Sequence, residues 1–259
     1  MDKSIVDLDA AISGIASGSS VAVGGFGMCG VPTVLIEALR TSGASDLEIV
    51  SNNCGAQGWG LATLLTDGRI RRVIASYFGT NEDFAEQYLS GRLEVEITPQ
   101  GTLAERLRAG GAGIPAFFTP TGVGTVVADG GMPWRYGRDG SVERESSPKE
   151  VRSFEVDGEP RAAVLEHAIR TDFALVRAAR GDRHGNLQFH GTAMNFNPLC
   201  AMAGRITLAE VEELVEPGVL TPDEIHVPGI FVQGVLPLTA AQAAAKKVEF
   251  MTMKKEATV

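Results

Sequence analysis

The chain is poor in cysteine and has no long apolar run. Its 259 residues include three cysteines, at positions 29, 54 and 200. An odd number of widely separated cysteines does not form a disulfide framework and is typical of a reducing compartment. No run approaches the roughly 18 apolar residues of a membrane-spanning helix, and residues 1–4 lack the basic and apolar layout of a signal peptide. We therefore expect a cytoplasmic protein with no membrane partner.

The chain also has fewer basic than acidic residues. The chain has 23 lysines and arginines against 32 aspartates and glutamates, which gives a formal net charge of −9 at pH 7. Nucleic acids and anionic membranes are bound by basic patches, so neither is an expected partner. The four histidines, His167, His184, His190 and His226, are scattered and lack the spacing of zinc ligands. We expect no bound metal.

The order of apolar and glycine-rich segments predicts an α/β fold. Over residues 1–125, short apolar strands alternate with loops and helical segments, which favours a mainly parallel sheet flanked by helices. Glycine, serine and proline then separate short β-like pieces, so we predict a β-rich excursion near residues 130–160. We assign residues 1–238 to one domain and residues 239–259, rich in alanine and lysine, to a peripheral tail.

Three further expectations concern individual segments. The spacing of Ile5, Leu8, Ile12 and Ile15 predicts an amphipathic helix at the start of the chain. We also predict a helix over residues 163–169. The acidic cluster Glu210, Glu212 and Glu213 could supply a catalytic carboxylate, but a run of charge is usually a solvated face, and we interpret it so.

Three loops with related chemistry follow predicted strands: residues 24–32, 51–55 and 98–102. Loops at the carboxyl ends of parallel strands meet in one crevice. The first loop offers backbone N–H groups at its glycines, and the other two offer side-chain amides. The candidate ligand-binding residues are Gly24, Gly25, Phe26, Gly27 and Gly30, and the candidate oxyanion-stabilising residues are Asn52, Asn53 and Gln100. Donors without a nucleophile indicate half of an active site.

The glycine loop has other possible interpretations. Gly25, Gly27 and Gly30 have the spacing of a dinucleotide-binding fingerprint. That fingerprint requires an acidic residue at the end of the second strand, where residues 51–53 are Ser-Asn-Asn, so a nicotinamide site is disfavoured. The glycines could also serve only tight turns. Likewise, each amide taken alone could be a structural turn or cap residue.

The cysteines do not form an obvious nucleophilic site. Cys29 and Cys54 have no adjacent histidine or other base that would generate a thiolate. We therefore interpret them as buried structural residues.

Taken together, these segments carry a family resemblance that extends through most of the chain. It rests on residues 23–32, 51–55, 93–117, 171–176, 185–187, 195–198 and 226–230. These segments resemble the A (α) subunit of family I coenzyme A transferases, of the succinyl-CoA:3-ketoacid (3-oxoacid) type. The continuous match over residues 93–117 is the most specific part of it.

The resemblance implies an α/β fold shared with sugar-phosphate isomerases, and an enzyme in two parts. In this family the catalytic glutamate lies in a Ser-Glu-Asn-Gly motif on the B subunit, and that motif does not occur here. Residues 51–55, Ser-Asn-Asn-Cys-Gly, would be the counterpart loop with asparagine in place of glutamate. The chain would thus be inactive without its B subunit.

The implied reaction moves coenzyme A from succinyl-CoA to a 3-oxo acid such as acetoacetate, as in ketone-body metabolism, through a glutamyl-CoA intermediate on the partner. Coenzyme A would be a substrate, and no cofactor would be permanently bound. A carboxylate is ionised at neutral pH and attacks a thioester without a general base. Two alternatives stay open: a two-chain hydrolase or ring-opening enzyme acting on a coenzyme A thioester, and a sensor that binds an acyl-CoA or a sugar phosphate.

Overall fold

The fold is built on one eight-stranded sheet. The computed structural model describes residues 1–79 and 81–245. The strand order is β13-β12-β10-β1-β2-β3-β4, with β11 paired to β10. These strands are β1 (Ser20–Val23), β2 (Leu47–Val50), β3 (Ile70–Ala75), β4 (Glu94–Ile97), β10 (Thr171–Asp182), β11 (Leu187–Gln188), β12 (Gly204–Val215) and β13 (Gly234–Pro237). All pairs are parallel except β10 with β11, so the predicted mainly parallel sheet is confirmed.

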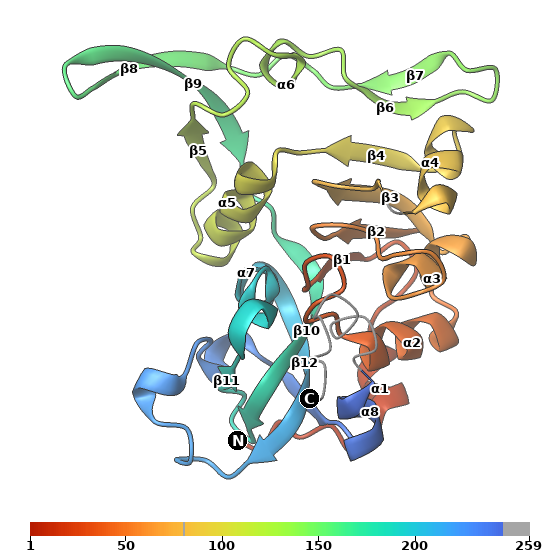
Figure 1. The fold of residues 1–259 in the computed structure, drawn as a ribbon, viewed down its shortest axis with the longest axis vertical. Coiled ribbons are helices and arrows are strands. Elements are labelled where there is room, and N and C mark those ends of the chain that lie inside the picture. Colours follow the sequence, from red (N-terminus) through yellow and green to blue (C-terminus); the bar gives the residue numbers. More distant parts are fainter. Residues whose placement is uncertain (80, 246–259) are drawn as a thin grey trace, which may run out of the picture.

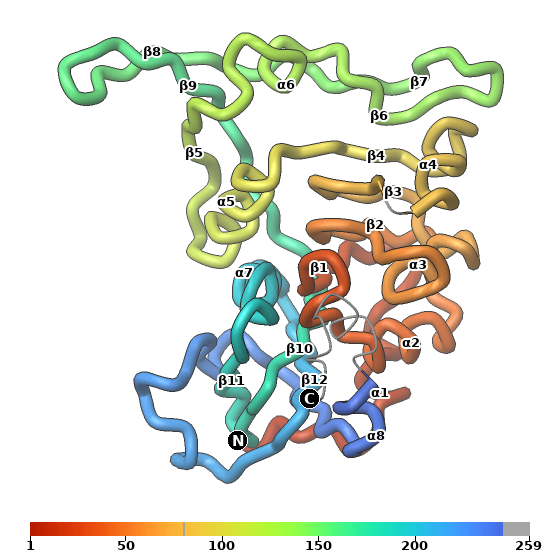
Figure 2. Tube along the Cα trace, viewed as in Figure 1, coloured from red at the N-terminus to blue at the C-terminus, as the bar shows by residue number. Residues whose placement is uncertain are grey.

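Helices cover both faces of the sheet (Figures 1 and 2). One face packs against α1 (Leu8–Ile12), α2 (Thr33–Ser42), α3 (Leu61–Thr66) and α4 (Glu82–Leu89), and the other against α5 (Gln100–Gly111) and α7 (Asn197–Ala203). Because side chains alternate along a strand, Val21 and Val23 enter the first core and Ala22 enters the second. Residues 21–23 of β1 are apolar on both faces, as in buried parallel strands.

The ends of the helices follow from local sequence. Asn81 caps α4 by accepting a hydrogen bond from the N–H of Phe84. Helix α2 buries Leu35, Ile36 and Leu39 and ends at Gly43, which has a φ of 80°. These helices hold the loops that follow β1, β2 and β3 along one edge of the sheet.

The predicted β-rich excursion is present beside strand β4 (Figure 1). It contains a hairpin of β6 (Pro133–Tyr136) and β7 (Val142–Glu145), and a sheet in the order β5-β9-β8. Its other elements are α6 (Val126–Asp129), β5 (Ala116–Thr119), β8 (Val151–Val156) and β9 (Glu159–His167). The Trp134 ring is contacted by Arg72 at 5.4 Å and by Arg144 at 5.6 Å, which anchors the hairpin by cation–π contacts.

The prediction of a helix over residues 163–169 is wrong, because most of that segment belongs to strand β9. Strand β9 pairs on both sides, with β5 and with β8. Val164 and Glu166 are buried two positions apart, which is the period of a strand. Pairing between distant segments has therefore overridden the helical preference of the alanines.

The predicted first helix is shorter than the apolar spacing suggested. Only Leu8–Ile12 is helical, although Ile15 is also buried. The chain before it is tied to the last strand, because the N–H of Ile5 donates to Val235 O at 2.7 Å. Backbone pairing with β13 thus replaces the first helical turn.

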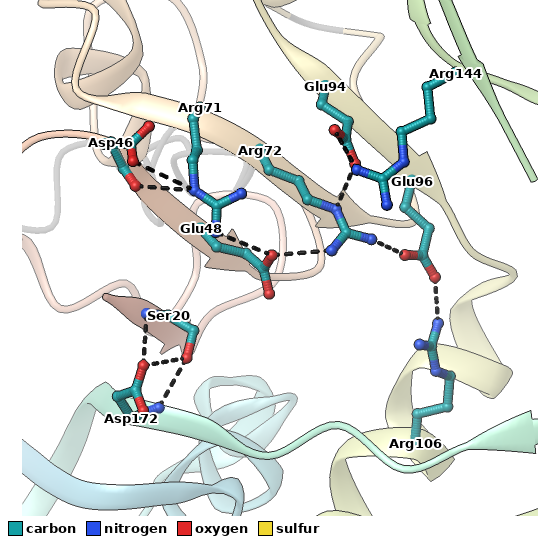
Figure 3. A network of polar contacts seen from close by, with 10 residues as sticks. All are labelled: Ser20, Asp46, Glu48, Arg71, Arg72, Glu94, Glu96, Arg106, Arg144 and Asp172. Carbon is teal, nitrogen blue, oxygen red and sulfur yellow. Dashed lines mark hydrogen bonds and ion pairs between the residues drawn. The ribbon is translucent and has the colours of Figure 1, made fainter. Parts of the chain in front are cut away.

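A row of charged side chains crosses strands β2, β3 and β4 (Figure 3). Arg72 lies at its centre, with Nη1 2.9 Å from Glu48 and Nε 3.0 Å from Glu94. Glu96 contacts both Arg72 and Arg106 of α5. Ion pairs thus join this part of the sheet to α5 and to the β6–β7 hairpin, in addition to the apolar packing of β2 and β3 against α5.

The remaining elements are η1 (Gly191–Met194), η2 (Pro222–Glu224), η3 (Gly229–Phe231) and α8 (Ala240–Ala244). Most of the predicted tail, from residue 246 to the end, lies outside the described residues. Its described part contacts the domain, because Arg177 Nη2 donates to the carbonyl of Ala243 at 3.1 Å.

Candidate active site

The three residues predicted as oxyanion donors lie together in one chain of hydrogen bonds. Gln100 Nε2 donates to Asn52 Oδ1 at 3.0 Å. Asn52 Nδ2 donates to Asn53 Oδ1 at 3.1 Å, and Asn53 Nδ2 donates to the carbonyl of Gly27 at 3.1 Å. Hydrogen bonds therefore link the loops after β1, β2 and β4. The loops after β2 and β4 contribute side-chain amides, and the loop after β1 contributes the carbonyl of Gly27.

The three amides differ in their access to solvent. Asn52 is 3% exposed and Asn53 is 7% exposed, whereas Gln100 is exposed at the first position of α5. Asn52 Oδ1 accepts a second hydrogen bond, from Ser76 Oγ at 3.0 Å. Two donors on one oxygen fix the orientation of the Asn52 amide. Gln100 is thus the amide free to reach a ligand, and the asparagines support it.

Ser76 was not among the site residues predicted from the sequence. It follows β3 directly, so it stands at the same edge of the sheet as Asn52 and Gln100. Its place at the carboxyl end of a parallel strand is the signal that selected the other loops, and the same signal could have identified Ser76. The apolar pattern of residues 72–78 resembles one continuous strand, so the sequence does not indicate that the strand ends before Ser76.

The glycine loop forms a tight turn at this edge. Phe26 and Cys29 exchange backbone hydrogen bonds of 3.0 and 2.9 Å. Gly27, between them, has a φ of 60°, a conformation that favours glycine, and open space where a Cβ would lie. Phe26 is half-exposed, and it projects beside the loop.

The pocket between these loops is too small for a substrate. It has a volume of about 10 Å³ and is lined by Gly24, Gly25, Gly27, Val31, Ser51, Asn53, Gly55 and Leu61. A space of this size holds about one water molecule. Ligand pockets are typically about 300–1,000 Å³, so walls from outside these loops would be needed to enclose an acyl-CoA.

Of the two cysteines interpreted as buried structural residues, Cys54 is buried and Cys29 is not. Cys54 and Cys200 are buried, and burial raises the pKa of each thiol to about 12. Neither forms a thiolate near neutral pH. Cys29 is partly exposed, and its Sγ lies 3.3 Å from Thr192 Oγ1.

The interpretation of the acidic cluster as a solvated face is wrong for Glu210. Its side chain is 0% exposed and accepts hydrogen bonds from the N–H groups of Val34 and Leu35, at 2.9 and 3.0 Å. It also pairs with Arg177 at 3.3 Å. Burial raises the pKa of Glu210 to about 7, against the lowering effect of these partners. Glu213 of the same cluster is exposed.

Metal-ligating clusters and membrane-spanning helices are both missing from residues 1–79 and 81–245. Within that part of the chain, no three histidine, cysteine or acidic side chains gather closely enough to hold a metal ion. None of its helices has the length and apolarity required to span a bilayer.

Known proteins with similar sequences share one family. The family model described as Coenzyme A transferase matches residues 5–237. A relative from Mycobacterium bovis, named as the A subunit of a "Probable succinyl-CoA:3-ketoacid coenzyme A transferase", is 59% identical over 254 residues, which cover 98% of this chain and 100% of the relative. The mitochondrial succinyl-CoA:3-ketoacid coenzyme A transferase 2A of Mus musculus is 52% identical over 227 residues, covering 87% of this chain and 43% of the mouse protein.

A solved structure supports the fold. The apoenzyme of an acyl-CoA transferase from Escherichia coli O157:H7 superimposes with a TM-score of 0.73 at 23% identity. The superposition covers 93% of this chain and 48% of the other. With the match over residues 5–237, these findings establish that the chain belongs to the coenzyme A transferase family.

Proposed function

We propose that this chain is the A subunit of a heteromeric enzyme that moves coenzyme A from succinyl-CoA to a 3-oxo acid such as acetoacetate. The observation that carries the proposal is the chemistry of the four loops at residues 24–32, 51–55, 76–79 and 98–102. They contain amides, hydroxyls and glycines but no aspartate or glutamate. The names of the mycobacterial and mouse relatives support the choice of substrates.

The nucleophile in this proposal is a glutamate of the B subunit. Its carboxylate attacks the thioester carbon of succinyl-CoA and the C–S bond breaks, so coenzyme A leaves as a thiolate and a mixed anhydride of succinate and the glutamate remains. The thiolate then attacks the glutamyl carbonyl, which gives glutamyl-CoA and free succinate. The carboxylate of the acceptor acid repeats these steps in reverse, and the glutamate is regenerated. No oxidant, reductant or metal is needed.

Each attack places negative charge on a carbonyl oxygen, and this chain supplies donors for it. We assign Nε2 of the exposed residue Gln100 and N–H groups of the glycine loop to these oxyanions. Asn52 and Asn53 hold Gln100 and the loop in position through the hydrogen bonds described above. One preorganised oxyanion donor typically contributes about 2.7–4 kcal/mol to the transition state.

A trapping experiment tests this division of labour. The chain is co-purified with a B subunit that carries the Ser-Glu-Asn-Gly motif. The complex is incubated with succinyl-CoA without an acceptor, and the intact mass of each subunit is measured by mass spectrometry. We expect a coenzyme A adduct on the B subunit but none on this chain. An adduct on this chain would contradict the proposal. Release of free coenzyme A at the rate of turnover would indicate a hydrolase instead.

The proposal also requires a stable complex of the two subunits. A crevice completed by two chains implies an interface of at least standard size, about 1,200 Å² or more. Gel filtration of the co-expressed pair should give one peak that contains both proteins, as an A–B pair or a dimer of pairs. Separate elution at micromolar concentration would count against it.

A further inference from the structure

We propose that Asn197 is a positioning residue that fixes the conformation of the glycine loop for the transfer reaction. Asn197 is the first residue of α7 and is 0% exposed. Its Nδ2 donates to the carbonyls of Gly30 at 2.9 Å and Ala193 at 2.8 Å, and its Oδ1 accepts the N–H of Arg177 at 3.0 Å. The inference rests on the proposed role of the loop as an oxyanion site.

The glycines on either side of the loop are fitted to this carboxamide. A Cβ on Gly24 would lie 1.9 Å from Asn197 Oδ1, and one on Gly30 would lie 2.8 Å from Asn197 Nδ2. Real Cβ atoms are not found at such distances, so Asn197 and these two glycines require each other. Gly24 is therefore glycine because Asn197 fills the space beside it. At Gly30, Asn197 Nδ2, the carbonyl of Ala193 at 2.9 Å and a φ of 69° all favour glycine, whereas the space beside Gly27 is open.

Two other asparagines hold neighbouring carbonyls of the loop. Asn53 Nδ2 donates to the carbonyl of Gly27 at 3.1 Å, and Asn195 Nδ2 donates to that of Cys29 at 3.1 Å. In a trans peptide, the carbonyl of one residue and the N–H of the next point in opposite directions. Fixing these carbonyls therefore also fixes the direction of the N–H groups of the residues that follow them. The clamp formed by Asn53, Asn195 and Asn197 sets the direction of the donors without touching the substrate.

The clamp is connected to strand β10 and helix α2 by buried polar contacts. Asn197 is bound to the backbone of β10 at Arg177, whose side chain pairs with the buried Glu210. Glu210 in turn accepts the N–H groups at the start of α2, the helix that follows the loop. One buried network thus holds the carboxyl end of the loop, and Gly24 at the other end packs against Asn197. A site that must be fixed to fractions of an ångström requires such support.

The test compares Asn197→Ala with Asn186→Ala in the co-purified complex. Asn186 is the matched control because it also makes carboxamide hydrogen bonds, to Asp182 at 2.7 Å and from the N–H of Gly229 at 2.9 Å, but lies in the β10–β11 turn. We expect Asn197→Ala to lower kcat by about tenfold or more with KM changed less than about threefold, because a misdirected donor costs transition-state stabilisation. Asn186→Ala should lower the melting temperature only. A kcat within about twofold of the parent for folded Asn197→Ala would overturn the proposal.

The dependence of kcat on pH in Asn197→Asp distinguishes a positioning role of Asn197 from a purely structural one. Ionised, its carboxylate would face two carbonyl oxygens, and burial would raise its pKa. Protonated, it could donate to one of them. We therefore expect kcat of the folded variant to rise as the pH is lowered, relative to the parent. A parallel pH profile, with melting temperature measured at each pH, would mean that Asn197 does not position the loop.

A double variant keeps the test decisive if a single change impairs folding. Gly24→Ala should fold poorly because its Cβ meets Asn197 Oδ1, and adding Asn197→Ala should restore folding by making room. We expect the double variant to regain solubility but not kcat. Regained kcat would overturn the proposal.

Hydrogen exchange separates this inference from the proposed function. In the parent and in each variant, the exchange of the peptide spanning residues 24–30 is measured by mass spectrometry. We expect faster exchange in Asn197→Ala and unchanged exchange in Asn186→Ala, whatever reaction the complex catalyses. A complex that transfers no coenzyme A while the loop responds in this way would refute the function and not the clamp. Unchanged exchange in Asn197→Ala would refute the clamp.

Discussion

Gln100 Nε2 lies 3.0 Å from Asn52 Oδ1, although the two residues are 48 positions apart in the sequence. The contact joins the loop after β2 to the start of α5, which follows β4, so it spans the one strand, β3, that lies between β2 and β4 in the sheet. Because Asn52 is buried and Gln100 is exposed, the pair places a supported amide at the edge of the sheet where these loops meet.

Replacing Gln100 with alanine should impair the reaction far more than the fold. We expect turnover to fall about a hundredfold, as for other single oxyanion donors, because the amide acts mainly in the transition state. The melting temperature should change by a few degrees at most. Steady-state kinetics of the reconstituted complex and thermal unfolding check the two expectations.

Gln188→Ala is the control for this prediction. Gln188 also makes side-chain hydrogen bonds, accepting from Arg180 Nε at 2.6 Å and donating to Glu224 Oε1 at 3.5 Å, but it lies in β11. Turnover of this variant should stay near that of the parent. If Gln100→Ala kept near-normal turnover and lost stability instead, Gln100 would be a helix-cap residue and would leave the site.

Arg72→Leu should destabilise the chain strongly. Arg72 is 17% exposed and is bound to Glu48 and Glu94 at 2.9 and 3.0 Å. Removing it leaves carboxylates without their counter-charge, and breaking such a buried pair typically costs about 3–5 kcal/mol. Denaturant unfolding measures the loss.

The neighbouring Arg71→Leu is the matched variant for that measurement. Its side chain is 43% exposed, and it lies 3.7 Å from Glu48. An exposed pair is worth about 1 kcal/mol or less. Equal losses of unfolding free energy in the two variants would show that burial of the Arg72 network contributes nothing to stability.

The buried Glu210 predicts an unusual dependence of stability on pH. Its folded pKa is raised from 4.5 to about 7. The folded state therefore binds more protons than the unfolded state in this range, so the Glu210 contribution to stability falls as the pH rises from 4.5 to about 7. The parent should lose about 3 kcal/mol relative to Glu210→Gln across that window.

Unfolding free energies of both proteins at several pH values check the sign. Glu213→Gln serves as the control, because Glu213 lies exposed on the same strand. A difference between parent and Glu210→Gln that grows with pH in favour of the parent would mean that Arg177 and the helix N–H groups outweigh burial, contrary to our assignment.

The sheet and its loops were predictable because their signals are local. Apolar strands followed by glycine or proline placed the loop at residues 24–32, and parallel order then brought Asn52 and Gln100 to one edge. The excursion near 130–160 was predictable for the same reason, from its glycines and prolines. Neither inference required knowledge of a distant contact.

The errors arose where distant segments decide the outcome. Strand β9 exists because β5 and β8 flank it, which no window around residues 163–169 reveals. Glu210 is buried by Arg177 and by the start of α2, which is 176 positions from it in the sequence. Asn197 lies at the start of α7, and its contact with Gly30 spans 167 positions.

The most direct test of the proposed division of labour is an exchange assay between succinyl-CoA and acetoacetate, with this chain alone and with its B subunit. We expect no acetoacetyl-CoA from the purified chain and sustained formation once the glutamate-bearing subunit is added. A B subunit whose motif glutamate is replaced by glutamine should restore nothing. Measurable exchange by this chain alone, free of any partner, would contradict the proposal that the nucleophile lies on the B subunit.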